Sequence, residues 1–276
     1  MNHRALQRTL FRMQIDPAFC AAIVSADEDA LASTDLGLHE RALLAAADPR
    51  GIRADQGGKR RLQVLGNATS EYALTLAAAA QEGRFENVLA DFAASRELHR
   101  AVIDDQPLAI AFGDFALRLF QVHADASRFA LATLERELAL LRRGDAPHAD
   151  ASVPKDALGL AAGARVLRLA AGTHALAAEL RAALDAGTLP ERISSVSPSA
   201  KEAVLLSRVG RRPAFGLAEV RAEPLDPPAD GLFLRLSDGP LSVTERAEVA
   251  QEAGASAADL EAFLQSFVDE GVLRRG

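Results

Sequence analysis

The chain has 276 residues but only one cysteine, Cys20, one tyrosine and no tryptophan. A single cysteine excludes a disulfide within the chain and a zinc site built from several cysteines. Aromatic residues make up 5% of the sequence, which argues against the stacking platforms that bind bases or sugars. Redox chemistry at paired cysteines and stacking on aromatic rings are therefore poor explanations of its function.

Long hydrophobic runs and excess positive charge are also missing. The longest apolar run, residues 73–80 counted across Thr75, is far shorter than the roughly 20 residues that span a bilayer, and the charged N-terminus leaves no signal-peptide core. Lys and Arg total 31 against 38 Asp and Glu, so the formal net charge is −7, which disfavours nucleic acid and anionic membranes as main partners. We expect a cytoplasmic protein with no membrane and no nucleic-acid partner.

The first 145 residues are predicted to form an all-helical domain. Apolar residues recur every three or four positions, most clearly over 127–142, where Leu131, Leu134 and Leu138 share one helix face. Gly144 follows as a C-cap, and a Pro-containing stretch then indicates a linker. An α+β domain is predicted from residue 156 to residue 276.

The spacing of apolar residues changes after the linker, from the three-to-four-residue repeat of helices to short runs typical of strands. Residues 164–169 predict a short strand, and Thr173 is expected to cap a helix that reaches Leu184. Two further strand-like runs, 203–209 and 215–220, flank a segment of turn composition, which favours a β-hairpin.

Three short helices are expected after the hairpin, over 228–236, 243–252 and 257–269, with Ser256 as an N-cap. A hairpin followed by three helices is a winged-helix outline, here occupying about 201–276. The predicted fold class is α+β, mostly α, with an N-terminal all-helical domain and a small winged-helix-like domain of β-hairpin plus three helices.

No pattern of catalytic or metal-binding residues stands out. The six histidines are scattered, none belongs to an HExxH motif, and no glycine-rich nucleotide loop occurs. Cys20 lies beside Phe19 on an apolar stripe, as a small core residue does. We therefore predict no catalytic residues, no metal site and no cofactor in this chain. A stand-alone enzyme would need distant His and carboxylate residues to converge in one cleft.

A winged helix often binds DNA, and this alternative can be weighed by charge. Residues 201–276 contain nine Lys and Arg against thirteen Asp and Glu, and the would-be recognition helix 257–269 has no basic residue. The alternative, a DNA-binding transcriptional regulator with an N-terminal helical sensor domain, predicts a basic face and salt-dependent binding to duplex DNA.

The hairpin can instead offer a strand edge to an extended peptide, with main-chain hydrogen bonds giving affinity and apolar pockets giving register. The adjacent helix 257–269 carries more apolar residues than one stripe requires. The predicted peptide-binding residues are Phe215, Leu217, Ala218, Glu219, Val220, Arg221, Leu260, Leu264 and Phe267. Arg211 and Arg212 are predicted to contact a partner or acidic residues of the peptide.

The C-terminal part resembles the PqqD-like peptide-recognition elements. The resemblance rests on residues 203–206, on the Leu236-Ser-Asp-Gly-Pro-Leu-Ser-Val243 turn and on 263–273. Those winged-helix elements bind the leader of a ribosomally made precursor peptide by adding it to a strand edge.

The whole chain is similar to MbnC-like partner proteins of methanobactin-type peptide-modification cassettes, through residues 6–19 and 165–173. In that family the partner has no catalytic centre and joins a TIM-barrel oxidase with a multinuclear iron site. The resemblance implies a non-catalytic subunit that binds a precursor leader, with iron expected only in the partner enzyme.

Overall fold

The computed structural model describes residues 2–48, 50–51, 56–144, 153–189, 192–209, 216–226 and 229–276. The chain folds into two compact units, Met1–Val122 and His123–Gly276. It is mostly helical with two small antiparallel sheets among the described residues, so the predicted α+β, mostly α fold class is confirmed. Among the described residues, no helix is long and apolar enough to cross a bilayer.

The first unit is built from helices. They are α1 (His3–Ile15), α2 (Pro17–Val24), α3 (Glu28–Ala32), α4 (Leu38–Ala45), α6 (Gln56–Thr69), α7 (Ala73–Gln81), α8 (Phe85–Ala93), α9 (Arg96–Asp104) and α10 (Leu108–Val122). The break between α1 and α2 follows from Asp16 and Pro17. The Asp16 side chain accepts a hydrogen bond from the Phe19 N–H, and Pro17 takes the first helical position, where its missing N–H costs nothing.

Buried rings from three segments hold the middle of this unit together. Tyr72, Phe92, Phe112 and Phe115 are at most 2% exposed. The Phe112 centroid lies 4.9 Å from that of Tyr72 and 5.0 Å from that of Phe92, both in edge-to-face geometry. Such pairs add to the free energy gained by burying the rings.

The second unit combines helices with two small sheets. Its elements are α11 (Ala126–Arg143), β1 (Leu158–Leu160), β2 (Ala164–Ala171), α12 (Thr173–Asp185), β3 (Ser197–Arg208), β4 (Val220–Leu225), α13 (Ala229–Asp238), α14 (Val243–Glu252), α15 (Ala257–Asp269) and β5 (Leu273–Arg275). The predicted strand at 164–169 and the three predicted C-terminal helices are confirmed with small shifts of their ends.

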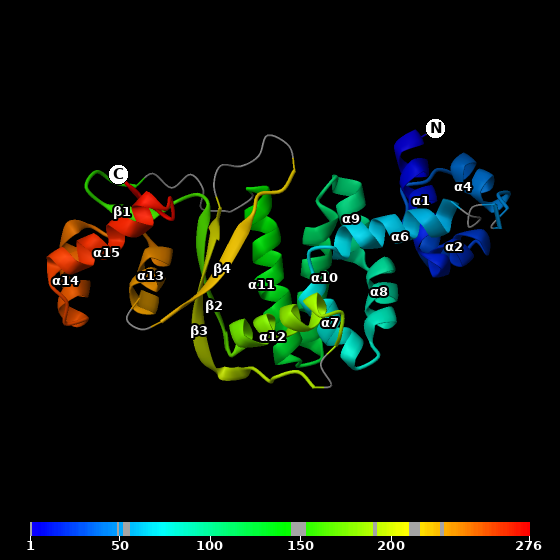
Figure 1. The fold of residues 1–276 in the computed structure, drawn as a ribbon. Helices are drawn as coiled ribbons and strands as arrows, with labels where there is room; N and C mark the ends of the chain where they lie inside the picture. The colour runs from blue at the N-terminus through cyan, green and yellow to red at the C-terminus, as the bar shows by residue number, and fades with distance from the viewer. Residues whose placement is uncertain are drawn as a thin grey trace. The chain divides into compact units, whose positions relative to one another are not determined.

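The larger sheet is antiparallel with the order β2-β3-β4, so β4 is an edge strand. Within this unit, α11 and α12 contact the sheet on one side and α13 on the other, as Figure 1 shows. The sheet faces differ accordingly, because Val204 and Leu206 are buried on the α11 side, while Leu205 joins the core beneath the C-terminal helices. The chain's end returns as β5 to pair with β1.

Three boundaries differ from the expectation. The second hairpin strand is predicted over 215–220, but β4 begins at Val220 and runs to Leu225, so most of it lies later in the chain. Thr173 is not the N-cap of α12: Gly172 holds that position, and the Glu202 carboxylate accepts from the N–H groups of Gly172 and His174. Helix α11 packs on the sheet of the second unit, whereas the sequence predicts it as part of the helical domain that ends at residue 145.

Candidate functional site: an apolar groove beside an edge strand

An open groove lies between β4 and the helices α13, α14 and α15, with a cavity volume of about 540 Å³. Its apolar lining comprises Leu205, Pro224, Leu225, Ala229, Leu232, Val249, Ala253, Ala255, Leu260, Phe263 and Phe267, and its polar lining Glu223, Asp226 and Asp259. Apolar clefts of this size with a few converging polar groups are typical of ligand-binding sites.

The aromatic side of the groove comes from α15. Phe263 and Phe267 lie one turn apart on that helix, so their rings meet in edge-to-face contact with centroids 5.1 Å apart. Phe267 also packs edge-to-face on Phe233, which is fully buried in the core below. Phe263, in contrast, is 42% exposed. The groove thus has a ring fixed at its base and a second ring open to solvent.

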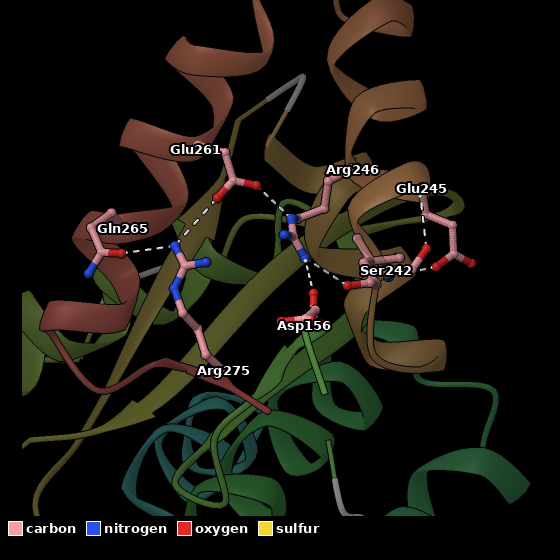
Figure 2. A network of polar contacts seen from close by, with 8 residues as sticks. Asp156, Ser242, Glu245, Arg246, Glu261, Gln265 and Arg275 are labelled. Atoms are coloured by element: carbon pink, nitrogen blue, oxygen red, sulfur yellow. Dashed lines mark hydrogen bonds and ion pairs between the residues drawn. The ribbon is translucent and has the colours of Figure 1, made fainter. Parts of the chain in front are cut away.

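A buried arginine fixes the helix that carries these rings. Arg246 of α14 donates from Nε to the Glu261 carboxylate of α15 at 2.6 Å and from an amino group to the Leu241 carbonyl at 3.0 Å (Figure 2). Arg275 of β5 donates to Gln265 of α15 at 2.9 Å and lies within ion-pair distance of Glu261. Polar contacts from two elements therefore hold the side of α15 that faces away from the groove.

The edge of β4 offers backbone groups along the groove. Val209 donates to the Glu219 carbonyl, while the Arg208 N–H points the other way, to Gly163. The antiparallel register then directs the backbone of Arg221 and Glu223 toward β3, and the backbone of Val220 and Ala222 outward. Pro224, also outward, has no N–H to leave unpaired, as is usual for proline in an edge strand. No described strand pairs with this edge.

The structure places only some of the predicted peptide-binding residues at the groove or in the strand beside it. Leu260 and Phe267 line the groove, and Val220 and Arg221 lie in the edge strand beside it. Leu264 does not line the groove: it is fully buried and part of the core. Phe215, Arg211 and Arg212 lie outside the described residues.

The remaining three predicted residues precede the strand. Leu217 is 49% exposed, and the Glu219 carbonyl accepts from Val209 in the last pair before β4. Ala218 is buried and its N–H donates to the Arg142 carbonyl of α11. Ala218 and Glu219 therefore anchor the start of β4, and none of the three residues lines the groove.

The sequence pattern did not single out the acidic residues of the groove. Glu223 and Asp226 follow the strand predicted over 215–220, so they fall beyond its expected end. Asp259 lies three residues after the predicted N-cap Ser256, and its N–H donates to the Ser256 hydroxyl. Phe263 belongs to the surplus of apolar residues on 257–269, but it is not among the predicted peptide-binding residues.

A small cavity of about 70 Å³ lies in the first unit, lined in part by Arg8, Arg12 and His99. Its charges are partly balanced, because Asp16 lies 3.9 Å from Arg12 Nε and 4.0 Å from His99 Nε2. Burial, together with the neighbouring Arg12 charge, lowers the pKa of His99 to about 4 against the opposing effect of Asp16. His99 is therefore neutral at pH 7.

No known protein family has a model that matches this chain, and a search of the curated proteins finds no match. Within the described ranges, His, Cys, Asp and Glu side chains form no group of three or more that is suited to hold a metal ion. Function is therefore inferred from the groove and from the edge of β4.

Proposed function

We propose that this protein is a non-catalytic partner subunit that binds the leader of a ribosomally made precursor peptide. It presents the peptide to an iron-dependent TIM-barrel oxidase, which carries out the modification. The observation that carries the proposal is the open apolar groove that runs beside the outward-facing edge of β4. The resemblance to PqqD-like elements and to MbnC-like partner proteins supplies the identity of the ligand and the enzyme.

An extended leader would add to β4 as a further strand. The outward N–H and C=O groups of Val220 and Ala222 and the C=O of Pro224 would take its main-chain hydrogen bonds. Alternate side chains of the leader would then point into the groove, against Leu260 and Phe263 of α15. A six-residue strand such as β4 offers about 20 Å of edge, enough for a short leader motif.

Binding to duplex DNA has less support. The helix that would enter the major groove, α15, carries Asp259, Glu261 and Asp269 and no basic residue. Glu261 is in addition bonded to Arg246 and so belongs to the internal contacts of the module.

The test is co-expression of the chain with a multinuclear iron TIM-barrel oxidase and a precursor peptide encoded next to its gene. We expect a complex of the three and a change in precursor mass that requires this chain. Ala222→Pro removes an outward N–H of β4 and should abolish leader binding while the complex with the oxidase persists. Modification of the precursor at the same rate without this chain would refute the proposal.

A further inference from the structure

The charged side chains that line the groove are all carboxylates, so the groove favours a ligand with positive charge. We propose that the peptide bound there is cationic as well as apolar, with Lys or Arg residues next to its apolar anchors. The inference rests on the proposed function, since it assumes a peptide ligand, and it specifies which peptides the groove selects.

The three carboxylates come from separate segments that meet at one groove. Glu223 belongs to β4, Asp226 follows this strand directly, and Asp259 lies in the first turn of α15. All three side chains belong to exposed residues, so their charges face the space that a ligand would enter. No Lys, Arg or His is among the described residues that line the groove.

One basic residue lies nearby but does not cancel this charge. Arg221 approaches Glu223 at 4.0 Å, and both side chains are more than half exposed. An exposed pair at that distance is weak and is easily exchanged for a ligand cation. Asp226 has no ion pair with a described residue, and Asp259 bonds to the Ser256 hydroxyl, which is neutral. A peptide with acidic residues at these positions would meet charges of its own sign.

The apolar surface fits the same class of ligand. Lys and Arg have long aliphatic stems that can lie along Leu260 while the charged group reaches the rim. The half-exposed ring of Phe263 offers a face for a cation. Because side chains alternate along an added strand, an apolar residue and a basic residue two positions apart would point to the same side, toward the groove.

The favoured sign differs from one of the two contacts predicted from the sequence. Arg211 and Arg212 are predicted to contact either the partner or acidic residues of the peptide, and they lie outside the described residues. In the groove itself, Glu223, Asp226 and Asp259 select for the reverse charge. Two or three exposed charge pairs together should change the dissociation constant by about tenfold.

The experiment begins with a phage-displayed library of random twelve-residue peptides, panned on the full chain. Enriched peptides are synthesised with a fluorophore, and their dissociation constants are measured by anisotropy. Versions in which each Lys or Arg is replaced by Gln or Glu are measured beside them. We expect enrichment of basic residues next to apolar ones, about tenfold weaker binding of the Gln versions, and a loss of this difference at high salt.

The matched protein variants are the triple substitution E223Q/D226N/D259N and the control triple D185N/E248Q/E270Q. The control removes the same charge from exposed residues that do not line the groove. Only the first triple should lose the preference for basic peptides. Circular dichroism checks that both variants are folded.

The outcomes separate the two proposals. Peptides that lose binding in Ala222→Pro but show no preference for basic residues would overturn the charge inference and leave the peptide-binding function standing. If no peptide binds, or if every peptide binds the Ala222→Pro variant as tightly as the unaltered chain, both proposals are overturned.

Discussion

Arg246 and Glu261 form an ion pair in which one partner is buried and the other is not. The Arg246 side chain is 6% exposed and that of Glu261 is 39% exposed, and their atoms meet at 2.6 Å. The same guanidinium also donates to the Leu241 carbonyl, next to the loop that starts α14. A buried charge with several hydrogen bonds fixes geometry, because its loss removes one donor from each of its acceptors at once.

Replacing Arg246 with Ala should destabilise the C-terminal helices by about 2 kcal/mol, since the Leu241 carbonyl and the Glu261 carboxylate each lose a hydrogen bond. Each keeps one further donor, the Leu158 N–H and Arg275 respectively. Hydrogen exchange measured by mass spectrometry should show faster exchange in α14 and α15. Arg235→Ala is the control, because the Arg235–Glu252 pair also joins α13 to α14 but is exposed, and it should cost no more than about 0.5 kcal/mol. Equal effects of the two substitutions would contradict a structural role for Arg246.

Substitutions at two neighbouring residues of α15 should affect different properties, one the free energy of unfolding and the other peptide binding. Leu264 is fully buried, so Leu264→Ala should lower the free energy of unfolding by about 2–4 kcal/mol through the cavity it leaves. Phe263→Ala should cost about 1 kcal/mol, because that residue is already 42% exposed, but should weaken peptide binding. The measurements are denaturant unfolding and peptide anisotropy. A large stability loss in Phe263→Ala would mean that the ring serves the core.

The sequence predicted the C-terminal helices well because their ends are marked locally. Ser242 and Glu245 form a capping box at the start of α14, and the Ser256 side chain caps α15. Such signals act within four residues, so they can be recognised without the fold. The apolar surplus of α15 was equally visible, but not which of its residues would be buried.

The position of β4 was not predictable in the same way. Its residues include Pro224, which usually marks the end of a strand, and the apolar residues before it looked more like the strand itself. Pairing with β3 decides the position, and an edge strand tolerates proline at an outward position. The acidic groove also depends on pairing, because it joins residues 223 and 259, which are neighbours only in the folded unit.

Two proline substitutions test the assigned hydrogen-bond direction of β4. Ala222→Pro removes an N–H that faces outward, so it should cost about 1 kcal/mol or less of stability. Glu223→Pro removes an N–H that faces β3, so it should cost about 3 kcal/mol and speed hydrogen exchange in β3. Unfolding by denaturant and exchange by mass spectrometry measure both. The reverse order of effects would show that the outward groups are those of Arg221 and Glu223.

The stability of the first unit should fall as the pH falls from about 6.5 to about 4. Burial and the Arg12 charge lower the pKa of His99 to about 4, while in the unfolded chain this histidine titrates near the usual value of about 6.5. The unfolded state therefore binds a proton in this range that the folded state does not, and the full stabilisation is present only above about pH 6.5. The loss on acidification should amount to at most about 3 kcal/mol.

His99→Gln should remove this part of the pH dependence, because no group at that position then takes up a proton on unfolding. Denaturant unfolding at pH 7 and pH 4.5 measures the difference for both proteins. His3→Gln is the control, since His3 is exposed at the start of α1 in the same unit and its replacement should leave the loss of stability on acidification in place. If His99→Gln and the unaltered chain lose the same stability between these two pH values, protonation of His99 is not the cause, and the carboxylates would have to account for the loss.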